Sequence, residues 1–123
     1  MTIALPPAMP RSEAVSRFLE RASGRLLLDG EWVPAAAGET FETRDPATGE
    51  LLASVARARG ADVEAAVASS RRALEAGPWP ALTPEARAAL LWRIADLLEA
   101  NIDELSELET LDQGKVLRTA RLG

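Results

Sequence analysis

The sequence contains no cysteine and no histidine among its 123 residues. The absence of cysteine excludes a disulfide framework, a zinc site built on thiolates and a cysteine nucleophile. The absence of histidine removes the side chain that titrates nearest neutral pH and that serves most often as a general base. Any chemistry that this chain performs alone must therefore use carboxylates, Lys, Arg or the hydroxyl groups of Ser and Thr.

Basic residues are in the minority, because 14 Lys and Arg stand against 19 Asp and Glu, for a formal net charge of -5. The segment from Asp96 to Asp112 holds several carboxylates and no Lys or Arg. This balance disfavours a nucleic-acid partner, since phosphates attract the opposite charge. No run approaches the roughly 18 apolar residues of a membrane span, and residues 1–7 lack the basic start of a signal peptide. We therefore expect a cytoplasmic protein without a membrane partner.

The first half of the chain carries the signals of one helix and two hairpins. After a flexible leader predicted over residues 1–11, Ser12 can cap a short helix that ends near Gly24. The pair Asp29-Gly30 then separates two apolar runs, as in a hairpin with a type I′ turn. A second antiparallel pair turns through residues 45–49, where proline presets one φ angle and glycine can adopt a positive one.

The second half has the helical period. Apolar residues recur every three or four positions after Gly60, which predicts helices over 62–76, 84–100 and 102–113. Asp62 is placed to cap the first of them, and a further helix is predicted from Val116 to Leu122. The expected fold of this chain alone is α+β: an N-terminal helix, antiparallel β-hairpins, then three helices. We expect part of the apolar stripes of these helices to stay exposed, because the hairpins cannot cover them all.

Taken one at a time, each candidate site residue is better explained by a structural role than by a catalytic or binding one. Asp103 and Glu107 stand one helical turn apart and could share a metal or divide acid and base roles, but a solvated helix face explains them better. Trp32 and Trp79 could stack on a ligand, although such tryptophans usually pack. Lys115 follows a helix end, where a basic side chain is common.

The order of the segments is more informative than any one of them. The strings are LLDGEWV at 27–33, GETFETRDPATGE at 38–50, GPW at 77–79, TPEAR at 83–87 and LSELETLDQGK at 105–115. In this order they closely resemble the N-terminal segment of the NAD(P)-dependent aldehyde dehydrogenase superfamily, over about residues 12–123. Several weak signals that agree in order make a strong one.

This resemblance implies a longer α/β parent enzyme with a Rossmann-type cofactor domain. Such enzymes oxidise an aldehyde to a carboxylic acid through a catalytic Cys and a Glu-activated water, with an Asn at the oxyanion, and pass hydride to NAD or NADP. The chain lacks all three catalytic segments, so no catalytic residue is assigned. Gly49 and Gly60 belong to no GxGxxG or Walker pattern, so no cofactor-binding residue is assigned and neither dinucleotide is expected to bind this chain tightly.

One site implied by the resemblance falls within the chain. Many members hold a monovalent cation through a Thr, the carbonyl of the next residue and the Asp of the LDxGK string. The matching positions are Thr43, Arg44 and Asp112, as a possible metal site. Hard oxygen ligands suit sodium or potassium, and a partial ligand shell should bind weakly.

Two interpretations of function remain open. In the first, residues 12–123 are the truncated N-terminal part of a dehydrogenase cofactor-binding domain, catalytically incompetent alone, whose partner is the rest of the dehydrogenase polypeptide or a second copy; the aldehyde substrate then belongs only to the parent. The alternative is a non-enzymatic helix-hairpin interaction module derived from that family. A small enzyme using the carboxylates of the acidic stretch is a third possibility.

Overall fold

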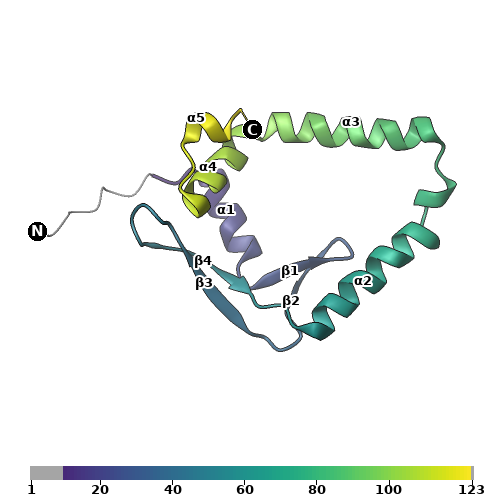
Figure 1. Ribbon diagram of the computed structural model, residues 1–123, viewed down its shortest axis with the longest axis horizontal. Coiled ribbons are helices and arrows are strands. Elements are labelled where there is room, and N and C mark those ends of the chain that lie inside the picture. Colours follow the sequence, from purple (N-terminus) through teal and green to yellow (C-terminus); the bar gives the residue numbers. More distant parts are fainter. Residues whose placement is uncertain (1–9, 123) are drawn as a thin grey trace, which may run out of the picture. The chain divides into compact units, whose positions relative to one another are not determined.

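The computed structural model describes residues 10–122, and its elements alternate between two compact units. The first unit comprises Thr40–Val55, the described chain up to Ser23 and the described chain from Asn101 onward. The second comprises Gly24–Glu39 and Ala56–Ala100. The predicted order of an N-terminal helix, two hairpins and three long helices is confirmed (Figure 1). Most of the leader predicted over residues 1–11 lies outside the described residues.

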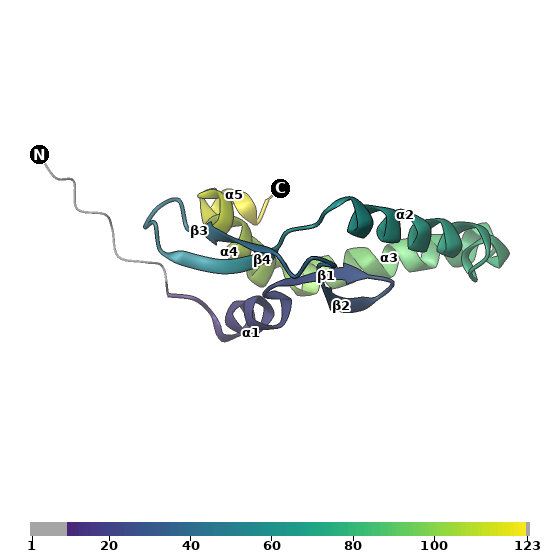
Figure 2. The same cartoon turned by 90° about the horizontal axis from the view of Figure 1, so that it is seen from below.

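The first unit packs two helices on a hairpin. Helix α1 (Glu13–Ala22) is capped as predicted, because Ser12 Oγ accepts a hydrogen bond from the Val15 amide. Strands β3 (Thr40–Arg44) and β4 (Leu51–Ala56) pair with each other. Helix α4 (Ile102–Gln113) contacts both α1 and β3, and the short helix α5 (Leu117–Ala120) packs on α4 (Figure 2).

The core of this unit is small. Val15, Leu52 and Leu111 are buried together, one from α1, one from β4 and one from the last turn of α4, with Leu19 and Leu108 partly buried around them. Side chains from three separate segments therefore meet at one point. This cluster sets the rotation of α4 about its own axis, because turning the helix would expose Leu111.

The second unit begins with the predicted tight hairpin. Strand β1 (Arg25–Leu28) pairs antiparallel with β2 (Glu31–Pro34), and Leu28 lies opposite Glu31. The two residues between the strands have positive φ angles, 53° at Asp29 and 81° at Gly30. This is the backbone of a type I′ turn, whose twist matches that of the strands.

Helix α2 (Gly60–Glu75) begins two residues before the predicted start. Asp62 is therefore not the residue before the helix but the third residue within it. Its carboxylate accepts hydrogen bonds from the Arg59 amide at 2.8 Å and from the Ala36 amide at 2.7 Å. The side chain thus caps the helix from inside and also holds the loop after β2. The Arg59 guanidinium pairs nearby with Glu39 at 2.6 Å.

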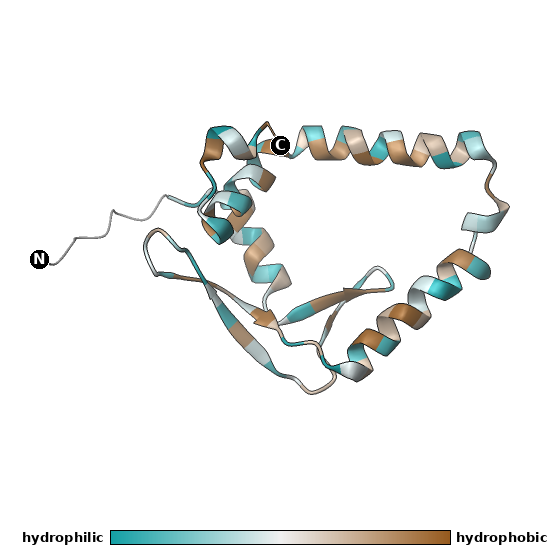
Figure 3. Cartoon of the chain, viewed as in Figure 1, coloured by the Kyte–Doolittle hydropathy of each residue, from teal (hydrophilic) through white to brown (hydrophobic). Residues whose placement is uncertain are grey.

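Helix α3 (Pro84–Ala100) follows the short 3-10 helix η1 (Trp79–Ala81) and has no buried residue. Its exposed apolar side chains include Leu90, Leu91, Ile94, Leu97 and Leu98. Hydrophobic residues recur along it in Figure 3. The expectation that these stripes remain exposed is confirmed for this helix. Over residues 10–122, no helix combines the length and the apolar character that a membrane crossing would require.

The shared carboxylate of Asp62 leads to a first prediction. Its two amide donors, Arg59 first and Ala36 second, lower the pKa of Asp62 below the ordinary value. A lowered pKa in the folded state means that the stabilisation is complete above the unfolded-state pKa of about 3.9 and is lost as the pH falls through the folded-state pKa. We expect Asp62→Asn to lower the urea concentration at which half of the helical circular-dichroism signal is lost at neutral pH. The asparagine side chain has only one acceptor oxygen, so its NH2 group must face one of the two backbone N–H groups, and that hydrogen bond is lost.

The matched control is Glu64→Gln, which removes the same charge from an exposed position of α2. The loss in Asp62→Asn should exceed that in the control at pH 7 and should shrink as both proteins are measured at progressively lower pH. Equal midpoints for the two variants at pH 7 would contradict the proposed role of the carboxylate.

Candidate functional site

The turn between β3 and β4 is ordered by one buried carboxylate. Asp45 is only 5% exposed, and its Oδ1 accepts a hydrogen bond from the Ala47 amide at 2.8 Å. The Gly49 amide donates to the Asp45 carbonyl at 2.7 Å, and Gly49 has a φ of 76°. The turn is therefore closed both by a side chain and by the main chain. The Asp-Pro-Ala-Thr-Gly string predicts a turn. An aspartate at the start of a turn commonly accepts a hydrogen bond from the backbone amide two residues later, so the sequence alone can predict this role of Asp45.

The end of α4 meets this hairpin at two points. Thr43 on β3 donates from Oγ1 to Asp112 Oδ1 on α4 at 3.0 Å. Two residues further on, Gly114 caps α4 in the left-handed region with a φ of 73°, and a Cβ built on it would lie 3.1 Å from Cγ of Pro46. The segments around positions 43–46 and 112–114 are thus joined by one hydrogen bond, and Gly114 lies so near Pro46 that a side chain at position 114 would crowd the proline ring.

The sequence places three residues at a possible cation site, and two of them meet. Thr43 and Asp112 are within hydrogen-bond distance. The Arg44 guanidinium points back into its own hairpin, where it donates to the Gly49 carbonyl at 3.1 Å and pairs with Glu42. It is the main-chain carbonyl of Arg44, not its side chain, that the predicted site would use.

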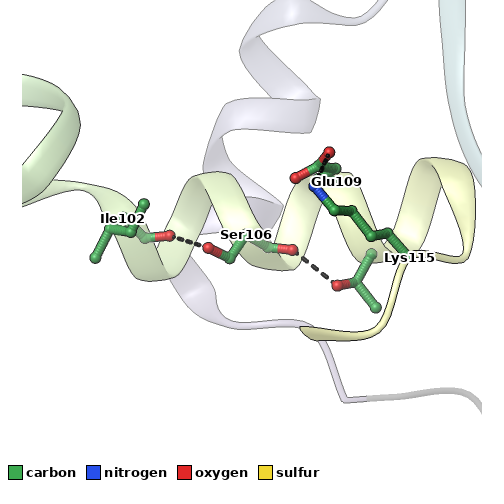
Figure 4. A network of polar contacts seen from close by, with 5 residues as sticks. Ile102, Ser106, Glu109 and Lys115 are labelled. Carbon is green, nitrogen blue, oxygen red and sulfur yellow. Dashed lines mark hydrogen bonds and ion pairs between the residues drawn. The ribbon is translucent and has the colours of Figure 1, made fainter. Parts of the chain in front are cut away.

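Helix α4 also carries a row of hydroxyl groups bonded to its own backbone. Ser106, almost fully buried, donates from Oγ to the Ile102 carbonyl at 2.6 Å, and Thr110 donates to the Ser106 carbonyl at 2.9 Å. Lys115 pairs with Glu109 at 3.0 Å (Figure 4). The lysine therefore neutralises a neighbouring carboxylate beside the helix end.

The remaining candidates have separate partners. Asp103 pairs with Arg121 at 2.7 Å, whereas Glu107 accepts a hydrogen bond from the Ser12 amide at 2.7 Å. Trp79 has the Arg87 guanidinium 6.0 Å from its ring centroid. Within the described part of the chain, no group of three or more Asp and Glu side chains could hold a metal ion. What the site around Thr43 and Asp112 offers is a hydroxyl oxygen and a carboxylate oxygen.

Comparison with known proteins gives a consistent result. The family model described as the aldehyde dehydrogenase family matches residues 32–122. Aldehyde dehydrogenase 1 of Tanacetum cinerariifolium is 50% identical over 97 residues, which are 79% of this chain and 19% of that protein. The NADP/NAD-dependent aldehyde dehydrogenase PuuC of Escherichia coli (strain K12) is 46% identical over 108 residues, 88% of this chain and 21% of that protein.

The solved structures agree. The structure of an aldehyde dehydrogenase from Bacillus cereus in complex with NAD+ superposes with a TM-score of 0.85 at 41% sequence identity. The match covers 90% of this chain and 22% of that chain. The present chain thus spans about a fifth of the length of the curated relatives it matches.

The lack of room for a side chain between position 114 and Pro46 is open to a direct test. We expect Gly114→Ala to destabilise the protein by about 1–2 kcal/mol through the left-handed backbone, with a further loss from the Cβ pressed against Pro46. Urea unfolding followed by circular dichroism measures the difference.

Gly49→Ala is the matched control, because Gly49 has a similar φ in the same unit and nothing within 4 Å of its built Cβ. Pro46→Ala should recover part of the lost stability when it is combined with Gly114→Ala. It should recover none when it is combined with Gly49→Ala. If the two glycine variants lose the same stability and respond equally to Pro46→Ala, crowding against Pro46 does not add to the cost of a side chain at position 114.

Proposed function

This chain belongs to the aldehyde dehydrogenase family, whose N-terminal segment it matches, and from that premise we propose that it contributes to an NAD(P)-dependent enzyme that oxidises an aldehyde to a carboxylic acid. The observation that carries the proposal is the family match over residues 32–122. The bound NAD or NADP accepts the hydride in such a reaction. The proposal places the enzyme in the cytoplasm and makes the rest of the dehydrogenase polypeptide the partner of this segment.

The residues of this chain then have a supporting role. Covalent attack on the aldehyde needs a thiol, and the sequence has none. The hairpins and helices instead supply a scaffold, in which the packing of α4 on α1 and β3 sets the relative positions of segments far apart in sequence. We infer that no dinucleotide is held tightly by this chain alone.

We also propose that Thr43, the carbonyl of Arg44 and Asp112 hold a monovalent cation in that enzyme. The support is the donor set: the Thr43 hydroxyl and an Asp112 carboxylate oxygen already lie 3.0 Å apart. Oxygen ligands of this kind suit sodium or potassium. A cation there would tie the β3 end of the hairpin to the end of α4.

The enzymatic proposal is tested by a chimaera. In it, this chain replaces the matching segment of the Escherichia coli relative PuuC. We expect the chimaera to reduce NAD or NADP with aldehydes, measured at the absorbance band of the reduced nicotinamide. The 123-residue chain alone should show no turnover and no micromolar dinucleotide affinity by calorimetry.

Two controls sharpen this test: the relative without its matching segment, and a chimaera with Leu111→Asp, which puts a charge into the small core. Both should be inactive. A chimaera that folds, as judged by its melting transition, and yet oxidises no aldehyde would argue against the enzymatic proposal and for the interaction module. Turnover by the isolated chain after rigorous purification would overturn the scaffold role.

The cation proposal has its own measurement. Sodium NMR linewidths, followed on the isolated chain during a titration, should broaden with roughly millimolar or weaker affinity, because the ligand shell is partial. Asp112→Asn should abolish the broadening, whereas Asp103→Asn, which removes the same charge from the same helix, should leave it. Identical titrations for the two variants would refute the assignment of Asp112.

A further inference from the structure

The tight turn between β1 and β2 places an aspartate directly before a glycine, and both residues are exposed to solvent. Asp29-Gly30 is the one Asp-Gly pair of the sequence, which contains no Asn-Gly pair. Because glycine has no Cβ, its amide nitrogen is the least hindered neighbour that an aspartyl carboxyl group can have. The turn therefore brings together two groups that can react with each other in water.

The reaction rearranges the backbone at this position. The Gly30 nitrogen attacks Cγ of the protonated Asp29 carboxyl group, a C–N bond forms, and one carboxyl oxygen leaves as water with the carboxyl proton and the amide proton. Water then opens the five-membered ring. Opening at Cγ restores aspartate, whereas opening at the main-chain carbonyl carbon gives isoaspartate, in which the chain runs through Cβ and Cγ. One water molecule is released and one is consumed, so the rearrangement needs no oxidant, reductant or cofactor.

Two side chains of α2 hold the Asp29 carboxylate in place. Ser69 donates from Oγ to Asp29 Oδ1 at 3.0 Å, and Arg72 Nη2 lies 3.6 Å from Oδ2. Ring closure turns the carboxyl group toward the Gly30 nitrogen and removes one of its oxygens, so these contacts must open first. The Arg72 side chain is 63% exposed, whereas Ser69 is half-buried. The hydrogen bond from Ser69 is therefore the stronger restraint, because exposed ion pairs contribute little.

We propose that Asp29 is a site of spontaneous isomerisation to isoaspartate, and that the hydrogen bond from Ser69 sets its rate. While the bond is in place the reaction is slow, and it proceeds when the bond opens. The inference goes beyond the proposed enzymatic function, because the reaction requires neither an aldehyde nor a dinucleotide.

The product changes the hairpin. Both residues of the present turn have positive φ angles, as a two-residue type I′ turn requires. Isoaspartate adds one main-chain carbon to this turn, and its free carboxylate branches from Cα instead of from the end of the side chain. The turn can then keep neither its type I′ backbone nor its contact with Ser69. Isomerisation should thus loosen β1 and β2 from α2.

The test follows the full chain during weeks of incubation at neutral pH. Trypsin releases residues 26–44 as one peptide, in which Asp29 is the only aspartate. Its isoaspartyl form has the same mass, elutes separately and is distinguished by electron-transfer fragmentation. We expect isoaspartate to accumulate at Asp29 in the folded chain, more slowly than in the same peptide synthesised alone. Ser69→Ala should raise the rate about two- to tenfold, as the loss of one hydrogen bond predicts.

Ser70→Ala is the matched control, because Ser70 is the next residue and its Oγ donates to the Ala66 carbonyl within α2. It should leave the rate unchanged, as should Ser69→Thr, which keeps the hydroxyl group. Circular dichroism should show equal helix content in all variants. The proposal is overturned if the folded chain forms no isoaspartate at Asp29, if it reacts as fast as the free peptide, or if Ser69→Ala and Ser70→Ala react at equal rates.

Discussion

The burial of Leu111 is the contact on which the first unit depends. Its side chain enters the space between Val15 of α1 and Leu52 of β4, so three segments distant in the sequence meet there. Because Leu111 is in the last turn of α4, its burial also fixes where the next residues lie. Asp112 faces Thr43, and Gly114 reaches Pro46. One apolar contact thus positions the oxygen ligands of the candidate site, even though none of those ligands is itself in the core.

The second unit depends on polar contacts at one place and leaves its apolar surface uncovered at another. Asp62 joins the start of α2 to the loop after β2 through two amide donors, while Asp29 accepts a hydrogen bond from Ser69 further along the same helix. Helix α3, in contrast, buries none of its side chains. An exposed large aliphatic side chain forgoes about 1.5–3 kcal/mol of burial energy. Such a surface becomes more stable when another apolar surface covers it.

Local sequence signals predicted the helices, strands and turns well. They were less accurate where one side chain forms hydrogen bonds to two segments that are distant in the sequence. The Asp29-Gly30 turn, the Ser12 cap and the turn at residues 45–49 depend on residues close in sequence, and each forms as predicted. The start of α2 was predicted two residues late, because an aspartate before an apolar helix is typically its cap. Asp62 instead accepts from Ala36, 26 residues earlier, and that partner cannot be read from the local pattern.

The sequence by itself was enough to identify the family and to exclude certain kinds of catalytic group from this chain. Composition excludes a thiol or imidazole catalyst within these 123 residues, and the order of motifs is carried by the chain whatever its conformation. Only the tertiary structure decided which residues meet. Thr43 and Asp112 are 69 positions apart, and their contact depends on the packing of α4 against β3. The same holds for Asp103 and Glu107. Their spacing allowed a shared site, although a solvated helix face was the favoured interpretation, and in the structure their partners lie on different segments. Spacing along a helix sets which side chains share a face, whereas only packing sets what that face touches.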